Sequence, residues 1–96
     1  MDVDKSSLSG QSFMTGNGTC TDAPVALIDQ SFVREALRGV TVHSRKTNSD
    51  PMYISNGSTD GFELLPGDSL LIPINSPASV FVFDGGDDCE YDWFSI

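Results

Sequence analysis

Short segments in which apolar and polar residues alternate recur along most of the chain. From Val40 to Arg45 the apolar side chains fall at every second position, and the same period of two runs from Leu70 to Ile74. Such alternation predicts β-strands with one face in a core, because successive side chains of a strand point to opposite faces. The predicted strands follow one another at intervals of roughly 8–12 residues, as in a sandwich or small barrel. They are Val25–Ile28, Val40–Arg45, Met52–Ser55, Phe62–Leu64, Leu70–Ile74, Ala78–Asp84 and Cys89–Ile96.

Glycine and proline mark the turns between these strands. Asn56-Gly57 is a strong turn signal, and Pro66-Gly67 has the residues of a type II turn, in which proline presets φ and glycine accepts a positive φ. Pro73 has no N–H to donate, so its strand is expected at a sheet edge or at a bulge. The strand Ala78–Asp84 is apolar on both faces and is therefore expected to be central. The fold class predicted is all-β, a small antiparallel β-sandwich or β-barrel of six to seven short strands.

Residues 1–19 differ from the rest, because they are polar and rich in glycine. We expect a flexible N-terminal arm over 1–19, with one short strand near Leu8 to Met14, and a β domain over 20–96. The apolar Leu8, Phe13 and Met14 are candidate anchors on a partner surface, since arms of this composition often become ordered only on binding. A frayed terminus is the alternative interpretation.

The segment Gln30–Gly39 is the only one with helical spacing of its apolar residues. Gly39 suits the C-terminal cap of a helix, but Arg34 stands where a capping box requires Glu or Gln. We expect a short turn there that leads into the next strand.

Charge and length narrow the function classes. The chain has 96 residues, which favours one domain, and a formal net charge of −9 with only five Lys and Arg. A nucleic-acid binder needs a basic face, and an anionic membrane would repel this charge, so neither is an expected partner. No secretion signal and no apolar stretch of membrane-spanning length is present, and we expect the protein to be used where it is made.

The residues with candidate chemistry are few. Cys20 and Cys89 form no C-x-x-C pair, and a disulfide between them and two reduced, partly buried thiols both remain open, the second being favoured. His43 is the lone histidine, and no nucleophile or carboxylate is linked to it in the sequence. We therefore expect no enzymatic activity and no cofactor.

The acidic residues near the C-terminus are a candidate Ca²⁺ site, since calcium takes 6–8 oxygen ligands and a Gly-Gly turn can bring carboxylates together. Their spacing does not match an EF-hand loop. A solvated hairpin, whose charges discourage aggregation, is the favoured alternative. The residues are Asp84, Asp87, Asp88, Glu90 and Asp92.

The ordered succession of motifs from Gly39 to Trp93 resembles a family of small tailed-phage virion proteins. About 55 of the 96 residues are covered. Ser55 stands where the family usually has Gly, and Phe81 where it usually has Tyr; the N-terminal third has no match. The motifs are VTVHS from Val40, KTNSDP from Lys46, MYIS from Met52, GFELLPGDS from Gly61, LLIPI from Leu70, SVFVF from Ser79, DGGDD from Asp84 and YDWFSI from Tyr91.

The resemblance implies a capsid decoration, or cement, subunit. Such a protein is expected as a trimer on the outer surface of a phage head, where it clamps neighbouring major capsid proteins. Leu70 and Ile72, on the predicted edge strand, join the arm residues as candidate contacts. A tail, neck or head-fibre component is one alternative, and a calcium-dependent binding module that uses the acidic turn is another.

Overall fold

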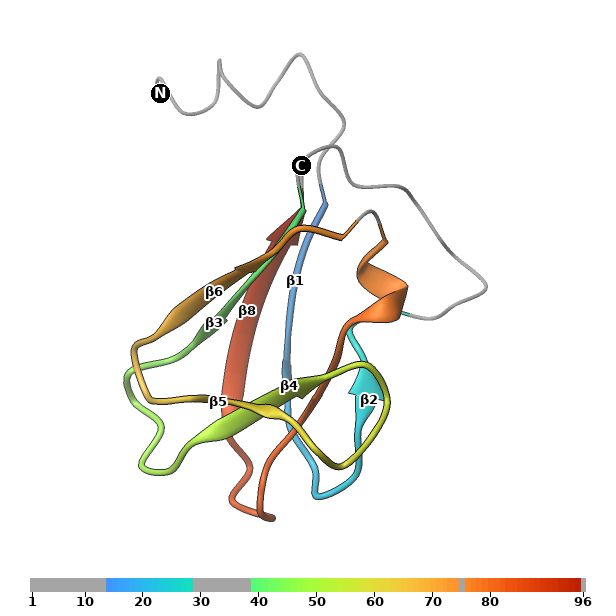
Figure 1. Ribbon diagram of the computed structural model, residues 1–96. Helices are drawn as coiled ribbons and strands as arrows, with labels where there is room; N and C mark the ends of the chain where they lie inside the picture. The colour runs from blue at the N-terminus through green and yellow to red at the C-terminus, as the bar shows by residue number, and fades with distance from the viewer. Residues whose placement is uncertain (1–13, 29–38, 75, 96) are drawn as a thin grey trace, which may run out of the picture.

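The computed structural model describes residues 14–28, 39–74 and 76–95. Eight strands form two antiparallel four-stranded sheets, one ordered β1-β8-β3-β6 and the other β2-β7-β4-β5 (Figure 1). The elements are β1 (Met14–Thr19), β2 (Val25–Ala26), β3 (Val40–Ser44), β4 (Met52–Ser55), β5 (Phe62–Leu64), β6 (Ser69–Ile72), the 3₁₀ turn η2 (Pro77–Ser79), β7 (Phe81–Phe83) and β8 (Glu90–Ser95).

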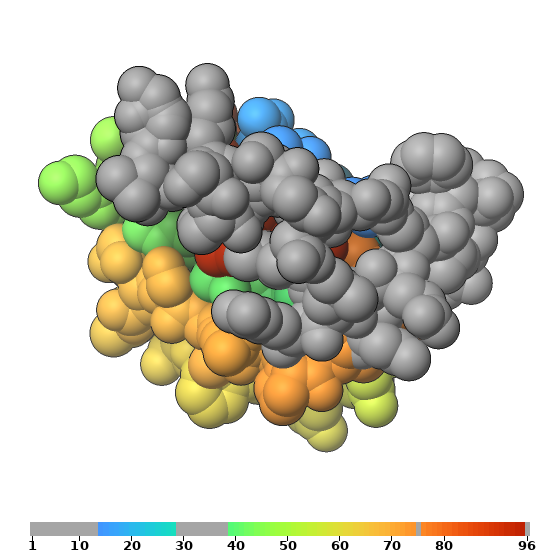
Figure 2. Space-filling view, turned by 90° about the horizontal axis from the view of Figure 1, so that it is seen from above, coloured from blue at the N-terminus to red at the C-terminus, as the bar shows by residue number. Residues whose placement is uncertain are grey.

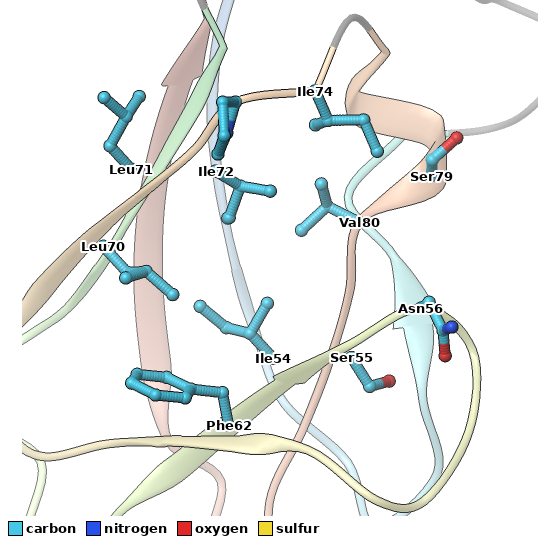
Figure 3. A pocket seen from close by; sticks show the side chains of 11 residues that line it. Ile54, Ser55, Asn56, Phe62, Leu70, Leu71, Ile72, Ile74, Ser79 and Val80 are labelled. Carbon is cyan, nitrogen blue, oxygen red and sulfur yellow. The ribbon is translucent and has the colours of Figure 1, made fainter.

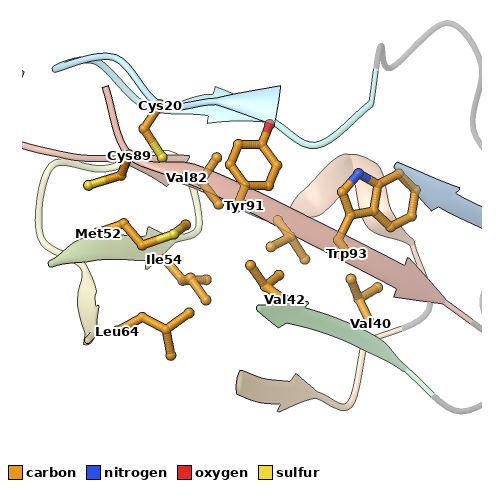
Figure 4. Close-up of a cluster of buried hydrophobic side chains, with 11 residues drawn as sticks. Cys20, Val40, Val42, Met52, Ile54, Leu64, Val82, Cys89, Tyr91 and Trp93 are labelled. Carbon is orange, nitrogen blue, oxygen red and sulfur yellow. The ribbon is translucent and has the colours of Figure 1, made fainter. Parts of the chain in front are cut away.

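The two sheets enclose one hydrophobic core, which confirms the predicted all-β class and makes the fold a sandwich. The alternation in β3 holds as expected, with Val40 and Val42 fully buried while Thr41 and His43 lie on the outer face. The described residues form eight strands, where the sequence predicts six to seven. The side chains that meet between the sheets are drawn in Figure 4: Cys20, Val40, Val42, Met52, Ile54, Leu64, Val82, Cys89, Tyr91 and Trp93.

The turn between β5 and β6 has the predicted form. The Asp68 N–H donates to the Leu65 carbonyl at 2.9 Å, and Gly67 has a φ of 92°, the left-handed conformation that glycine accepts. Gly67 and Asp68 together oppose Ser44 of β3, because the Gly67 N–H donates to the Ser44 carbonyl and the Ser44 N–H donates to the Asp68 carbonyl. This is a G1 bulge, and it fixes the register of β6.

The strand that contains Leu70 and Ile72 lies at the edge of its sheet, as Pro73 predicts. The Ile74 N–H donates to the Ile72 carbonyl at 2.8 Å, so the chain turns away from the sheet directly at Pro73. Among the described strands β6 therefore has one neighbour, β3.

The predicted central strand is confirmed, but it is shorter than expected. β7 lies between β2 and β4, and the Phe83 ring on its outer side stacks on Tyr53 at 5.3 Å between centroids. Ala78 and Ser79, predicted as its beginning, belong instead to η2. Pro77 opens that turn, and the Ser76 hydroxyl caps it by accepting from the Ala78 N–H at 3.3 Å.

The prediction of a loosely ordered arm is wrong for Met14–Thr19, which form the edge strand β1. Its register with β8 places Gly16 opposite Trp93 and Gly18 opposite Tyr91. A Cβ on Gly16 would lie 2.6 Å from Trp93 Nε1, and one on Gly18 would lie 2.6 Å from the Tyr91 hydroxyl. The glycines are therefore inward positions of a strand, left without side chains so that two large rings fit between the sheets.

Some predictions fall on residues outside the described ranges. They include the contacts assigned to Leu8 and Phe13, the short strand near Leu8 and most of the segment Gln30–Gly39. Within the described ranges, no helix is long and apolar enough to cross a membrane.

Candidate interaction surface

An apolar groove opens between the edge strand β6 and the β4–β5 hairpin. It has a volume of about 420 Å³, and none of its lining residues is charged. In Figure 3, Phe62 points from β5 toward Leu70, while Ile72 and Ile54 face each other across the middle of the groove. The lining is Ile54, Ser55, Asn56, Phe62, Leu70, Leu71, Ile72, Pro73, Ile74, Ser79 and Val80.

The groove exists because the two edge strands on this side are short and diverge. β5 has three residues and β6 has four, and they are joined directly by the turn at Pro66-Gly67. Phe62 remains 60% exposed although it faces Leu70 across the groove, and an apolar surface of this kind is a typical contact site. Among the described residues, this part of the apolar surface is left uncovered.

Two of the predicted contact residues line this groove, and a third lies elsewhere. Leu70 and Ile72 are half-buried there and also pack against the core. Met14 begins β1 at the opposite edge of the same sheet and packs against the core as well, so it is a structural residue of the sandwich. The described structure therefore does not indicate that Met14 anchors a flexible arm.

Sequence reasoning missed Phe62 as part of this surface. The sequence predicts only that Phe62 belongs to a short strand, and its register opposite Ile54 directs it inward. β5 is an edge strand, however, and no further strand in residues 14–28, 39–74 and 76–95 covers the ring. The signal available in the sequence was the near-continuous apolar run on both sides of Pro66-Gly67. The chain folds back at this turn, so Phe62 and Leu70 face one another.

A second, smaller hollow lies on the outer face of the sheet β1-β8-β3-β6. Leu71, Thr41 and Phe94 are neighbours in one row across three strands, and Phe94 is 43% exposed. The hollow has a volume of about 320 Å³ and is lined mainly by polar side chains. It is less apolar than the groove and makes a weaker candidate for a docking surface.

The same face brings a serine and an aspartate beside the lone histidine, which the sequence did not indicate. Ser69, His43 and Asp92 lie in one row, and the His43 Nδ1 is 2.8 Å from the Ser69 hydroxyl. A catalytic triad requires the carboxylate to accept a hydrogen bond from the imidazole. Both Asp92 oxygens instead accept from Arg45, at 3.0 and 2.8 Å. The three side chains are therefore not arranged as a catalytic triad.

The acidic residues near the C-terminus have separate structural partners. Asp84 is 3% exposed; its Oδ1 accepts from the Gly86 N–H and its Oδ2 from the Cys89 N–H, both at 2.8 Å. Asp92 and Glu90 lie on β8 against Arg45, whose Nη1 is 3.3 Å from Glu90 Oε1. The Arg45 N–H groups bound to the Asp92 carboxylate hold the pKa of Asp92 below its usual value.

The remaining two acids, Asp87 and Asp88, are exposed in the turn before β8. Reduced contact with water, and then the neighbouring carboxylates of Asp50, Asp84 and Asp88, raise the pKa of Asp87. Among the described residues, no group of three or more His, Cys, Asp and Glu side chains has an arrangement that could hold a metal ion. The structure therefore adds no support to the calcium hypothesis.

The two cysteines are neighbours across β1 and β8, at one end of the core (Figure 4). Both are buried and unbonded to each other, and the Cys20 N–H donates to the Cys89 carbonyl at 2.7 Å. The Cys89 thiol donates to the Asp50 carbonyl, with 3.2 Å between Sγ and oxygen. Burial first, and then nearby negative charge from Asp84, raises the pKa of Cys20 to about 12 and that of Cys89 to about 11.

Both thiols should resist alkylation in the native protein. Only the thiolate reacts with iodoacetamide, and pKa values near 11 and 12 leave almost no thiolate at about pH 8. Mass spectrometry should detect no adduct on the folded chain and two adducts after denaturation in urea. Rapid modification of the folded chain at the same pH would contradict the buried, protonated state of these residues.

Comparisons with known proteins find no relative of this chain. No protein-family model, no curated protein and no solved structure matches it. The functional argument therefore depends on the motifs of the sequence and on the surface described above.

Proposed function

We propose that this chain is a structural virion protein, a decoration or cement subunit that binds the outer surface of a phage head. In this role it clamps neighbouring major capsid proteins and stabilises the shell, and it acts as a trimer after synthesis in the host cytoplasm. No enzymatic step and no cofactor is part of the proposal.

The observation that carries the proposal is the uncharged apolar groove beside β6, an edge strand of the described sheet. The chain as a whole has a formal net charge of −9, yet none of the residues that line the groove is charged. An exposed apolar surface of this kind favours a protein partner, because removing apolar surface from water lowers the free energy. The motif order from Gly39 to Trp93 supplies the class of partner, a phage shell.

A decoration subunit would act through many weak contacts at once. Binding to a preformed lattice is multivalent, so a modest groove suffices at each site. The bound subunits would stabilise the shell by mass action, since they bind the assembled state and not the free capsid protein. The small β-sandwich suits this role, because its long-range antiparallel pairing holds the groove in one shape.

Capsids prepared with and without this chain provide the test. We expect the decorated shells to melt at a higher temperature and to survive osmotic shock better. Phe62→Lys, which places a charge in the groove, should reduce shell binding at least tenfold. Thr59→Lys adds the same charge in the exposed loop before β5 and is the matched control, with binding unchanged. Equal stability of both kinds of shell, with no copies bound, would refute the proposal.

Copy number separates the head from the tail. Hundreds of copies per particle are expected for a protein of the shell. Three to twelve copies, measured by quantitative mass spectrometry of purified particles, would place the chain in the tail, neck or fibre and would also refute the decoration role.

A further inference from the structure

The chain contains two Asn-Gly pairs, Asn17-Gly18 in β1 and Asn56-Gly57 directly after β4. Asparagine loses its amide most readily before glycine, because glycine has no side chain to hinder the attack of its backbone nitrogen on the asparagine side chain. The fold favours glycine in both pairs. Gly57 has a φ of 115°, and a Cβ on Gly18 would lie 2.6 Å from the Tyr91 hydroxyl. The two pairs therefore have the same local chemistry and differ in what surrounds them.

Few contacts hold the backbone around Asn56. Residues 56–61 form an exposed loop between β4 and β5. The Gly57 N–H donates to the Ser55 hydroxyl at 3.2 Å, which is a local side-chain bond and not a bond between strands. Within the described ranges, no hydrogen bond involves the Asn56 side chain. Exposed loops with so few bonds open at little cost in free energy, so the Gly57 nitrogen can reach the Asn56 side chain.

Asn17, by contrast, lies within a paired strand. The Cys20 N–H donates to the Cys89 carbonyl at 2.7 Å, and hydrogen-bonded pairs recur at every second residue of an antiparallel ladder. Gly18 is opposite Tyr91, so its N–H is bonded in this ladder and is not available to the Asn17 side chain. The backbone of Asn17 cannot rotate unless β1 separates from β8.

Asn48 is held by its own side chain. Its Nδ2 donates to the Ser44 hydroxyl at 3.0 Å and to the Glu90 carbonyl at 2.9 Å, and its Oδ1 accepts from the Glu90 N–H at 2.8 Å. The residue after it is Ser49, whose side chain hinders attack by the backbone nitrogen. Of the three asparagines in the described ranges, only Asn56 combines a following glycine with an unbonded side chain in an exposed loop.

We infer that Asn56 is a site of spontaneous modification, at which the side-chain amide becomes a carboxylate on the margin of the apolar groove. The Gly57 nitrogen bonds to Cγ of Asn56, the Cγ–Nδ2 bond breaks, and the proton of the Gly57 N–H leaves with the amide nitrogen as ammonia. Water then opens the resulting cyclic imide at either of its two carbonyl carbons and leaves aspartate or isoaspartate. One water is consumed for each ammonia released, and no other reactant takes part.

The position of Asn56 gives this modification a consequence for the groove. Asn56 is one of the lining residues, none of which is charged, and Figure 3 shows it at the end of β4 beside Ser55. Seen from above in Figure 2, the yellow residues of the β4–β5 hairpin lie at the surface beside the orange residues of β6. A carboxylate here would lose water when a partner covers the groove, which costs free energy. The modified chain should therefore bind a shell more weakly, a consequence that rests on the proposed function.

Incubation of the full chain at mildly alkaline pH, followed by peptide mass spectrometry, tests the modification. Asn56 should gain the mass of amide-to-acid conversion at least tenfold faster than Asn17 or Asn48, and an isoaspartyl methyltransferase should label part of the product. In urea, where the chain is unfolded, Asn17 and Asn56 should react at similar rates, since glycine follows both. Equal rates for Asn17 and Asn56 in the folded chain would overturn the inference. An Asn56 that stays intact in the folded chain but reacts in urea would overturn it as well.

Two variants measure the effect on the groove and separate it from the proposed function. Asn56→Asp supplies the charged product directly and should bind phage shells at least threefold more weakly than the wild type. Asn56→Gln keeps an uncharged amide and is the matched control, with binding unchanged. If both variants coat shells equally, the modification does not affect the groove. If Asn56 is modified but the wild type coats no shell, the modification site stands and the decoration role is lost; an intact Asn56 on well-coated shells has the opposite meaning.

Discussion

Replacing Asp84 by alanine should lower the free energy of unfolding by about 3 kcal/mol, since hydrogen bonds to a charged group contribute about 1.5–3 kcal/mol each. The buried carboxylate accepts from two backbone N–H groups, those of Gly86 and Cys89, and closes the turn that leads into β8. Alanine leaves both donors without an acceptor. The Asp84 N–H also donates to the Thr21 carbonyl at 2.8 Å, so a disordered turn would loosen the chain after β1. Urea denaturation followed by tryptophan fluorescence measures the change.

Asp87→Asn in the same turn is the matched control for Asp84→Ala. Asp87 is exposed, and reduced contact with water and then the neighbouring carboxylates raise its pKa, so removal of its charge should leave the stability unchanged or raise it slightly. If the two variants lose the same stability, the acidic turn affects stability through its total charge. The two hydrogen bonds that Asp84 accepts from Gly86 and Cys89 would then not be the cause. If the loss for Asp84→Ala depends on added Ca²⁺, the calcium hypothesis regains support.

The predicted strands from Val40 onward succeeded where both local signals agreed. In β3 and β8 the alternation of apolar residues has period two, and a glycine lies before each strand, Gly39 before β3 and Gly86 before β8. Pro73 was more informative still about the position of its strand. A residue without an N–H cannot donate to a neighbouring strand, so proline indicates an edge of the sheet. These signals are local, and a sequence pattern reports local geometry well.

The sequence was less informative where a residue's role depends on what lies opposite. Phe62 looks like a core residue in its own strand, and only the short β5 and the absence of a covering strand in the described sheet leave it at the surface. The row of Ser69, His43 and Asp92 comes from three strands distant in sequence. Asp84 looked like one acid among five, and only its buried position, bonded to two N–H groups, sets it apart.

The strand β1 shows the same limit most clearly. Its sequence, MTGNGT, has no apolar alternation, and two of its six residues are glycine, a composition typical of a loop. The inward side chains of this strand are supplied by its partner: the rings of Trp93 and Tyr91 occupy the space that Gly16 and Gly18 leave empty. Composition within the segment therefore could not predict the strand.

Replacing Gly16 by valine should accordingly destabilise the protein by about 2 kcal/mol, within the 1–3 kcal/mol typical of an overpacked core. The new Cβ would lie 2.6 Å from Trp93 Nε1 and 2.9 Å from Cε2, both on a buried ring. Either the indole leaves its place or β1 separates from β8. Both changes alter the environment of the single tryptophan, so thermal unfolding and the emission maximum of tryptophan fluorescence should shift together.

Two further variants separate a clash with Trp93 from a simple loss of glycine. Asn17→Val places the same side chain on the next residue of β1, where it faces solvent, and valine favours strands, so stability should stay the same or rise. Gly16→Val combined with Trp93→Leu removes most of the ring and should recover part of the loss caused by Gly16→Val, relative to Trp93→Leu alone. A double variant whose losses simply add would mean that the ring does not lie over Gly16, and the register of β1 on β8 would have to be revised.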